Sequence, residues 1–392
     1  QALERPILLL DAGPAHSRLL ERAMFDVPPP PELEIDAVIL EGIKQLRIQK
    51  RKVGAPAANQ VQLQINCVGI CGSDMAYWAK GVAGGFVQLD FTPQGLCEGY
   101  CGQLGHECSG TVVAVGKDVT HLGVGDRVAL EPGVPCADCS QCRRGRYNLC
   151  PKMSFIGSAV NKVPGAMCTV FNHAASYCYK LPPHVSLEEG AMLEPMCVSL
   201  QAVTRAKVGL GHKVLVSGAG PIGLMTALCA RAAGAASVTI TDVVEAKLAK
   251  ARELGIEHTL KADAPDLLAA LEALTGGDRF DAVFECCGVP AALRTCIEAA
   301  APGSVVCVVA NFGETTPVNL QLAARREIDI IGVYRYCNLY PKALDLVATG
   351  KVNLKPLISK IFSMAEANQA FEYFATGEPI KVIIQPNAPK AQ

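Results

Sequence analysis

The sequence predicts an α/β protein in which a β-rich unit is followed by a doubly wound parallel sheet. Three observations support this prediction. Short strand-like segments separated by Gly and Pro run to about residue 180, strands alternate with helix-length segments after about residue 196, and a glycine-rich turn opens the second region. The 392 residues are enough for two or three domains.

Composition and charge exclude several classes of protein. Half of the residues are hydrophobic and 19% are charged, which excludes a largely disordered chain. With 36 basic and 37 acidic residues the net charge is −1, so bulk charge does not favour nucleic acid or a membrane surface as a partner. No apolar run reaches the ~20 residues of a membrane span. The 18 cysteines in so long a chain favour a reducing compartment, and we expect a cytoplasmic protein.

Residues 1–34 are predicted to form an N-terminal extension outside the core. Pro28 to Pro31 are a stiff extended run, and the stretch lacks the pattern of a secretory signal. Strand patterns begin at about residue 36 and continue to about residue 180. The expected strands lie around 38–40 and 46–48 and at 60–65, 110–115 and 126–130.

Beyond residue 196 the pattern changes to alternating strands and helices. Strands are expected at 213–217, 237–241, 280–284 and 304–309, with helices at 221–233 and 244–254 and further helices between the later strands. This alternation predicts a parallel sheet with helical crossovers. After about residue 334 the pattern is mixed again, and this tail is expected to rejoin the first unit.

The glycine-rich turn has the context of a dinucleotide-binding site. Gly218, Gly220 and Gly223 follow the strand at 213–217 and open a helix. In that context they allow a tight turn, the close approach of a pyrophosphate, and helix–strand packing. Asp242 ends the second strand, where a carboxylate binds both ribose hydroxyls and repels a 2′-phosphate, so NAD is favoured over NADP. The alternative is an ordinary glycine turn beside a solvated Asp242.

Four cysteines form a pattern typical of a structural zinc site. Cys136, Cys139, Cys142 and Cys150 lie within 15 residues. Four thiolates complete a tetrahedral shell and leave no open position, so such a site is structural rather than catalytic. The alternative is four reduced cysteines without a metal.

A second, dispersed set of residues predicts a catalytic zinc site. Cys71 offers a thiolate and His106 an imidazole, Glu107 follows His106, and Glu194 lies before the dinucleotide region. Two or three protein ligands leave a position where a substrate oxygen binds. Asp74 is a candidate to accept the second ring N–H of His106.

These residues, with the segments around them, resemble the zinc-dependent medium-chain dehydrogenase/reductase family, and within it the sorbitol dehydrogenase branch. The resemblance runs from about residue 36 to about residue 385. The segments that carry it are 68–74, 77–78, 104–107, 145–149, 193–195, 218–223 and 332–338. It implies a GroES-like catalytic domain at 35–195 and 335–392, a Rossmann NAD-binding domain at 196–334, and a homotetramer.

The resemblance also implies roles for matching positions. Cys71, His106 and Glu107 match catalytic zinc ligands. Glu194 matches a carboxylate that binds the zinc or its water, and Ser73 is a candidate proton relay or simply a hydroxyl bonded to the backbone. The substrate-contacting positions are Tyr77, Phe155, Glu194, Arg335 and Tyr336. The cofactor-contacting positions are Gly218, Gly220, Ile222, Gly223, Asp242, Lys247, Val309, Ala310, Asn311, Val333, Tyr334 and Arg335.

The function implied is oxidation of a sorbitol-like polyol at C2 to a ketose, with hydride transfer to NAD. Family members that oxidise simple alcohols carry a Cys where this chain has Glu194, which favours a polyol. Xylitol, L-arabinitol, 2,3-butanediol and L-threonine are alternative substrates. A zinc- and nucleotide-binding regulator without catalysis is disfavoured, because it has no need for an open metal position.

Two features depart from the family pattern. Animal members of the sorbitol branch often lack the four structural cysteines, which this chain has. The segment from Gly81 to Gln103 is longer than expected and carries Cys97 and Cys101. It lines the substrate entrance or, more simply, is a tolerated surface loop.

Overall fold

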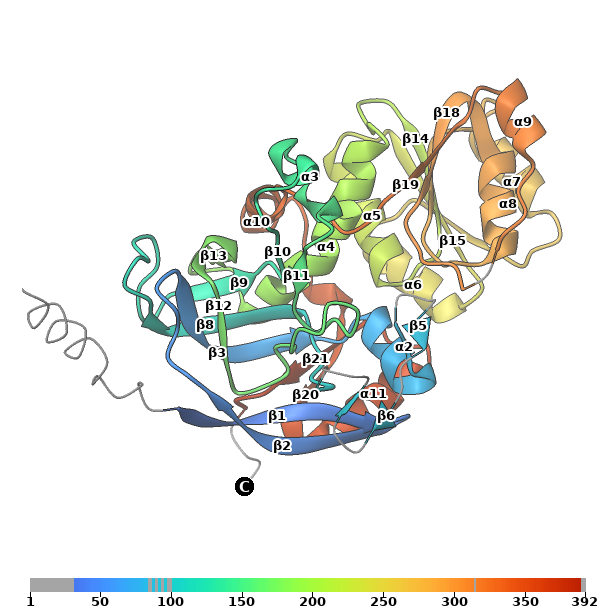
Figure 1. Ribbon diagram of the computed structural model, residues 1–392. Helices are drawn as coiled ribbons and strands as arrows, with labels where there is room; N and C mark the ends of the chain where they lie inside the picture. The colour runs from blue at the N-terminus through green and yellow to red at the C-terminus, as the bar shows by residue number, and fades with distance from the viewer. Residues whose placement is uncertain are drawn as a thin grey trace, which may run out of the picture.

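The computed structural model describes residues 32–83, 87–88, 91–92, 95–96, 101–313 and 315–388. The proline run of the predicted extension and Cys97 lie outside these residues. Two large sheets organise the molecule, one in each of its two halves (Figure 1).

The first sheet is mostly antiparallel. Its strands follow the order β13-β9-β8-β3-β21-β20, and β12 also pairs with β3. Alternate residues of the third strand (Val61, Leu63 and Ile65) are fully buried, as the alternation in the sequence predicts. The strands of this sheet are β3 (Gln60–Gly69), β8 (Glu107–Val115), β9 (Arg127–Leu130), β12 (Val170–Ala174), β13 (Cys178–Lys180), β20 (Ile358–Ser363) and β21 (Lys381–Gln385). The last two strands come from the end of the chain: β21 pairs with β3, and β20 pairs with β21 at the edge of the sheet.

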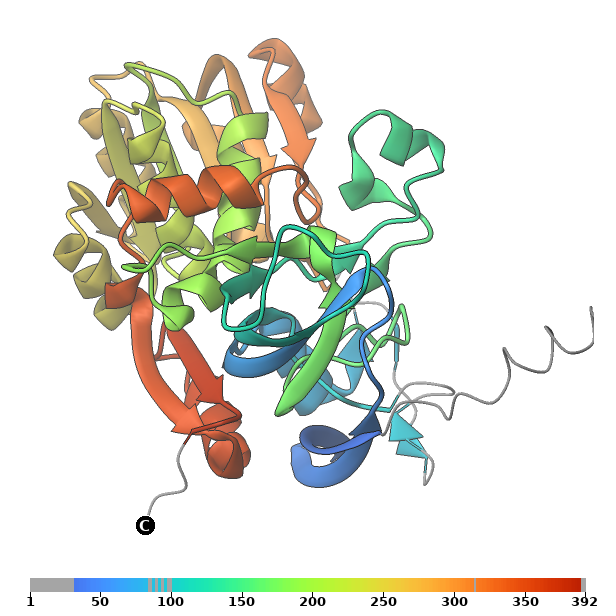
Figure 2. The same cartoon turned by 90° about the vertical axis from the view of Figure 1, so that its left-hand side faces the viewer.

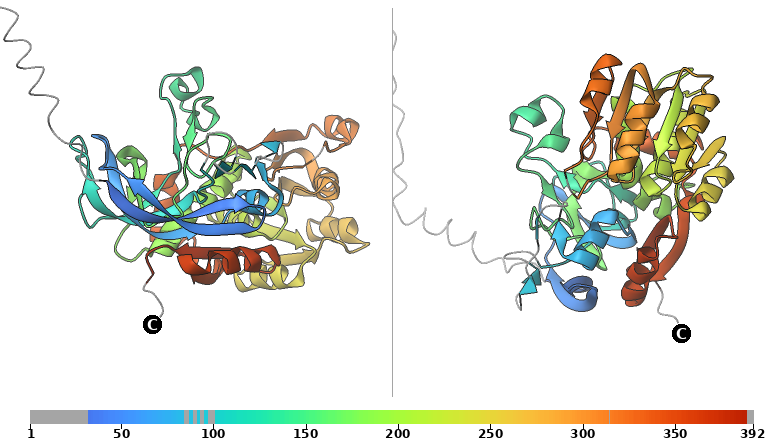
Figure 3. Two further views of the ribbon diagram at one scale, coloured as in Figure 1. Left: turned by 60° about the horizontal axis from the view of Figure 1, so that its bottom comes forward. Right: turned by 90° about the vertical axis from the view of Figure 1, so that its right-hand side faces the viewer.

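Smaller elements surround this sheet. An antiparallel hairpin is formed by β1 (Leu33–Gly42) and β2 (Gln45–Val53). The helical elements are α2 (Gly72–Lys80), α3 (Ser140–Arg143), η1 (Tyr147–Leu149), η2 (Ala175–Tyr177), η3 (Lys355–Leu357), η4 (Met364–Glu366) and α11 (Ala367–Ala375). The short strand pairs are β4 (Val82–Ala83) with β5 (Val87–Gln88), β6 (Phe91–Thr92) with β7 (Gly95–Leu96), and β10 (Gly133–Val134) with β11 (Ser154–Phe155). The part of the chain that carries α3 stands out from the body (Figure 3).

The second sheet is parallel throughout and confirms the predicted doubly wound unit. Its order is β16-β15-β14-β17-β18-β19. The strands are β14 (Lys213–Ser217), β15 (Ser237–Asp242), β16 (His258–Lys261), β17 (Phe280–Glu285), β18 (Ala300–Val308) and β19 (Asp329–Gly332). The helices are α5 (Pro221–Ala232), α6 (Glu245–Glu253), α7 (Leu267–Leu274), α8 (Pro290–Ala299) and α9 (Leu320–Arg325). No helix in the described part of the chain is long and apolar enough to cross a membrane.

Two helices lie between the sheets: α4 (Leu187–Arg205) and α10 (Tyr340–Ala348), which pack on each other (Figure 2). A capping box starts α4, because the Ser186 hydroxyl accepts from the Glu189 N–H and the Glu189 carboxylate accepts from the Ser186 N–H. The helix contacts β3, β8 and β9 on one side and α5 on the other. One continuous core cluster therefore contains Cys67 from the first sheet and Val214 from the second.

Candidate catalytic site

Strand register brings three of the predicted zinc ligands together. Cys71 follows β3 and is the N-cap residue of α2, while His106 and Glu107 lie at the start of β8. Because β3 pairs with β8 so that Gly69 faces Glu107, Cys71 just after β3 lies close to His106 and Glu107 at the start of β8. One ligand atom of each of Cys71, His106 and Glu107 lies within 4.8 Å of the others.

Asp74 lies behind this group. Its Oδ2 accepts a hydrogen bond from the Cys71 N–H at 3.1 Å, which closes the first turn of α2. Its Oδ1 lies 3.8 Å from Nδ1 of His106, too far for the predicted hydrogen bond but within ion-pair range. Asp74 is fully buried, and that burial raises the pKa of its carboxyl group. Asp74 is therefore a near neighbour of the His106 imidazole, and its Oδ1 faces Nδ1 of that ring.

Glu107 has a partner that sequence reasoning missed. The ammonium group of Lys381 donates to both Glu107 carboxylate oxygens, at 2.8 and 2.6 Å, and to the Ile70 carbonyl at 3.0 Å. A side chain at position 69 would meet the Glu107 carboxylate and would displace it from its place beside Lys381. The signal available in the sequence was a single Lys at the start of an otherwise apolar run, Ile380–Ile384.

Glu194 approaches the group from α4 but is not one of its three members. Its Oε1 accepts a hydrogen bond from the Tyr336 hydroxyl at 2.9 Å. Burial raises the pKa of Glu194 to about 7, although the nearby His106 opposes this shift. A carboxyl group with such a pKa exists in both protonation states near neutral pH, which suits it to proton exchange.

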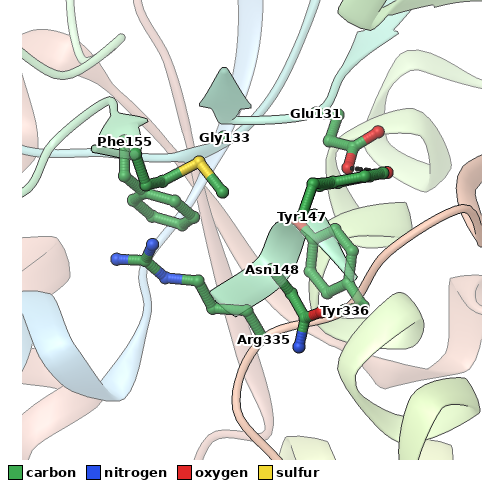
Figure 4. A pocket seen from close by; sticks show the side chains of 8 residues that line it. Glu131, Gly133, Tyr147, Asn148, Phe155, Arg335 and Tyr336 are labelled. Atoms are coloured by element: carbon green, nitrogen blue, oxygen red, sulfur yellow. Dashed lines mark hydrogen bonds between the residues drawn. The ribbon is translucent and has the colours of Figure 1, made fainter. Parts of the chain in front are cut away.

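Phe155, one of the predicted substrate residues, contacts both His106 and Arg335. The centroid of its ring is 5.5 Å from that of the His106 ring. The same centroid is 3.9 Å from Cζ of Arg335, which lies beside it in Figure 4. Tyr77 is buried on α2, where burial and then Asp74 raise the pKa of its hydroxyl to about 12. Ser73 is half-buried in the first turn of the same helix. The site is thus aromatic on one side and carries ionisable groups on the other.

The glycine motif forms the predicted turn at the end of β14. Gly218 has φ of +101°, and a side chain at Gly223 would collide with the Gly218 carbonyl. Asp242 ends β15 and holds the turn, because its Oδ2 accepts from the Ala219 N–H at 2.7 Å and its Oδ1 from the Val244 N–H at 2.8 Å. This second, structural role of Asp242 was not predicted.

The other predicted cofactor residues follow the same edge of the parallel sheet. Val309, Ala310 and Asn311 come after β18, and Val333, Tyr334 and Arg335 come after β19. Ile222 lies in the first turn of α5 and Lys247 in the first half of α6, both half-buried. The carboxyl ends of parallel strands are where such sheets bind dinucleotides, so this placement fits the prediction.

The four predicted structural cysteines form a separate cluster, here called the four-cysteine lobe (residues 136–150). Their sulfur atoms lie within 4.8 Å of one another, with separations of 3.5 Å for Cys139–Cys142 and Cys136–Cys150 and 4.0 Å for Cys136–Cys142. The pKa of Cys136 is lowered to about 6 by hydrogen bonds from backbone N–H groups, and the bond from Asp138 has the largest effect. Backbone hydrogen bonds also lower the pKa of Cys139.

Both groups of side chains fit zinc. Four sulfurs bound to one Zn²⁺ at ~2.3 Å in a tetrahedron are about 3.8 Å apart, which is close to the separations in the four-cysteine lobe. Thiolate, imidazole and carboxylate are the donors that zinc prefers, and the group at Cys71 contains one of each. It supplies three ligands and so leaves a coordination position open.

Comparison with known proteins places the chain in a family. The model of the alcohol dehydrogenase GroES-like domain matches residues 57–183, and that of zinc-binding dehydrogenase matches residues 221–349. Sorbitol dehydrogenase of Gallus gallus is 42% identical over 351 residues, covering 89% of this chain and 96% of the relative. The chain belongs to the zinc-dependent medium-chain dehydrogenase/reductase family.

Two other members of this family are also similar. Sorbitol dehydrogenase of Homo sapiens is 40% identical over 351 residues, which are 89% of this chain and 95% of the relative. The crystal structure of 2R,3R-butanediol dehydrogenase from Bacillus subtilis matches with a TM-score of 0.81 at 28% identity, covering 90% of this chain and all of that one. The predicted family and fold class are thereby confirmed.

Proposed function

We propose that this protein oxidises a sorbitol-like polyol at C2 to a ketose, with NAD as the hydride acceptor. One observation carries the proposal. The side chains of Cys71, His106 and Glu107, which could hold zinc, lie near Phe155, which contacts Arg335, and Arg335 follows β19 at the carboxyl edge of the parallel sheet. The Tyr336–Glu194 pair adds a hydroxyl and a carboxyl group. Polar groups at a buried wall suit a substrate with several hydroxyls better than a simple alcohol.

The residues divide the work of the reaction. Cys71, His106 and Glu107 would hold the zinc, which would supply Lewis acidity toward the C2 hydroxyl. A bound nicotinamide would supply the hydride acceptor. Glu194 is placed to exchange a proton near neutral pH, and Tyr336 orients it through the 2.9 Å hydrogen bond. Ser73 is the candidate that passes the hydroxyl proton to solvent.

Substrate orientation falls to the aromatic and cationic side chains. Tyr77 and Phe155 exclude water from the reacting carbon, since both are buried next to the zinc group. Arg335 presents guanidinium N–H groups to hydroxyls further along the chain. A site built to donate to hydroxyls rejects substrates that leave these donors unpaired.

The preference for NAD over NADP rests on Asp242. Each of its carboxylate oxygens already accepts one backbone hydrogen bond and has a lone pair left for ribose hydroxyls. A 2′-phosphate at the same place meets a negative charge. We propose NAD for that reason, with the contacts of Lys247 and the 309–311 and 333–335 segments completing the cofactor site.

We further propose a second, structural zinc in the four-cysteine lobe, a cytoplasmic location and a homotetramer. The four thiols, whose sulfur atoms lie within 4.8 Å of one another, support the zinc. The domain boundaries at 196 and 335 also stand as a proposal, supported by the change from one sheet to the other on either side of the 196–334 segment.

A panel of substrates tests this function. Sorbitol, xylitol, L-arabinitol, 2,3-butanediol and L-threonine are offered to zinc-loaded protein with NAD, and NADH formation is followed. We expect sorbitol and xylitol to react fastest and chelation to abolish the reaction. If only butanediol or threonine yields NADH, the proposed sorbitol-like substrate is wrong. If the protein binds nucleotide but turns over none of these substrates, the proposed enzymatic activity is wrong.

A further inference from the structure

The four-cysteine lobe is tied to the segment 333–338, which follows β19. Nδ2 of Asn148 donates to the Tyr334 carbonyl at 2.9 Å. The Asn338 N–H donates to the Tyr147 hydroxyl at 2.8 Å, and Nδ2 of Asn338 donates to the Gly145 carbonyl at 2.9 Å. Residues that are 186–193 positions apart in the chain are thus held in contact at two points, Tyr334 and Asn338.

Two of the residues assigned to the substrate, Arg335 and Tyr336, lie between these two points. Arg335 and Asn338 have positive φ, at +54° and +57°. Asn adopts this backbone readily, but it is unfavourable for Arg, so contacts around Arg335 are needed to hold it. The bond from Asn148 is the contact next to Arg335 in the chain.

The side chain of Arg335 responds directly to the position of this backbone. Its guanidinium carbon lies 3.9 Å from the centroid of Phe155 and 4.9 Å from that of Tyr334, and Nη2 lies 3.5 Å from Oδ1 of Asn161. Arg335 and Asn148 line one small cavity of about 10 Å³, together with Phe155 and Tyr336 (Figure 4). The cavity has room for about one water molecule, so the side chains around it are closely packed. A shift of the Arg335 backbone would therefore break these contacts.

Asn148 is buried for this contact. Only 3% of its surface is exposed, and within the described residues its Oδ1 forms no hydrogen bond. A half-satisfied buried amide is unfavourable for stability, so a purely structural role is poorly served by Asn at this position. The polar interaction that its side chain makes is the one that fixes Tyr334.

We propose that Asn148 is a positioning residue for substrate selection: by holding the Tyr334 carbonyl it sets the place of Arg335, which selects polyols that carry hydroxyls beyond the reacting carbon. The inference rests on the proposed function. It assigns the four-cysteine lobe a part in choosing the substrate as well as in keeping the fold.

The test compares long and short substrates in Asn148→Leu, which keeps the branching and the number of heavy atoms of the side chain and removes its donor. We expect the KM for sorbitol to rise about fivefold or more, with kcat within twofold, because one hydrogen bond is lost and Arg335 is released. The KM for 2,3-butanediol, which lacks the remote hydroxyls, stays unchanged when NAD is saturating, as does the zinc content. Arg143→Ala is the matched control, since this exposed side chain of the same lobe bonds Asp138 and not the segment.

A double-mutant cycle with Arg335→Ala shows whether Asn148 acts through Arg335. We expect the Asn148→Leu effect on the sorbitol KM to disappear in the Arg335→Ala background. Equal losses on both substrates, or effects that multiply in the double variant, would overturn the proposal.

Hydrogen exchange supplies a readout that needs no substrate. Amides of 333–338 should exchange faster in Asn148→Leu than in the wild type or in Arg143→Ala, and unchanged exchange overturns the proposal by itself. If the wild type oxidises no polyol, the proposed function is wrong, and so is the selection of polyols by Arg335. If the exchange result nevertheless holds, Asn148 still positions the segment 333–338.

Discussion

The ammonium group of Lys381 lies 2.8 and 2.6 Å from the two carboxylate oxygens of Glu107, and the side chains of both residues are 2% exposed. The pair joins the strand β21 to the zinc group on β8. Both carboxylate oxygens are engaged by Lys381, so the same carboxylate that is proposed to bind zinc also neutralises a buried cation. Removing either partner therefore leaves an uncompensated charge in the interior.

Replacing Lys381 should destabilise the protein strongly. We expect Lys381→Met to lower the free energy of unfolding by about 3–5 kcal/mol in chelated protein, the usual cost of stranding one member of a buried ion pair. Urea unfolding measures this. The double variant Lys381→Met/Glu107→Gln should regain most of the loss, whereas Lys50→Met, which breaks an exposed pair with Asp36, should have no measurable effect. A single variant as stable as the wild type would contradict this prediction.

Replacing Arg335 should affect substrate binding and spare the metal. Arg335→Ala loses donors to substrate hydroxyls and the contact with Phe155, so the polyol KM should rise about tenfold or more. Zinc content, measured by metal analysis, should stay at the wild-type value. Wild-type kinetics in this variant would remove Arg335 from the substrate wall.

Replacing Asp242 should shift the cofactor preference. Asp242→Ala removes the carboxylate that is proposed to bind ribose hydroxyls, and the ratio of kcat/KM for NAD to that for NADP should fall about tenfold or more. The ratio is the readout, because loss of the bonds to Ala219 and Val244 loosens the turn for both cofactors. Asp278→Ala, at an exposed site of the same sheet unit, is the control.

Replacing one cysteine of the lobe should remove one zinc. Cys139→Ser leaves three thiols, so the zinc content should drop by about one equivalent per chain while zinc at the Cys71 group is retained. Metal analysis of Cys101→Ser, outside both groups, gives the reference value. Full zinc content in Cys139→Ser would refute a metal in the four-cysteine lobe.

His173 should make stability depend on pH in the mildly acidic range. Its buried ring bonds the Glu131 carbonyl at 2.8 Å, and burial lowers the pKa of His173 to about 4. Between the unfolded pKa of ~6.5 and this folded value the unfolded chain binds the proton and the folded protein does not. The contribution is therefore fully present above about pH 6.5 and is lost as the pH falls towards 4, by about 1.4 kcal/mol per pH unit. Urea unfolding at several pH values should show a shallower dependence in His173→Gln; identical slopes would contradict the prediction.

Much of the fold followed from local patterns. Periodicity placed β14 at its observed residues and α5 within one residue, because strands and helices of a parallel sheet are long apolar runs closed by glycine or proline. It missed the beginning of β18, which starts at Ala300 rather than at Ser304, because Pro302 and Gly303 interrupt the pattern.

The site was predictable only in part. Spacing alone indicated the four-cysteine lobe. The residue types Cys71, His106, Glu107 and Glu194 indicated the dispersed zinc group, and the resemblance then implied their roles. Lys381 beside Glu107 and Asn148 beside Tyr334 were missed, since these partners are 274 and 186 residues apart and meet only through the path of the chain. Contacts of this kind depend on tertiary packing, which no local pattern encodes.

The helix α4 has a consequence for how the molecule comes apart. It is buried against the antiparallel sheet on one side and against the first helix of the parallel sheet on the other, within a single apolar cluster. Each half also has a cluster of its own, but loss of either half exposes the apolar surface that it shares with the other through α4. Denaturation should consequently be cooperative across both halves, so that the two sheets unfold together with a common free energy of unfolding.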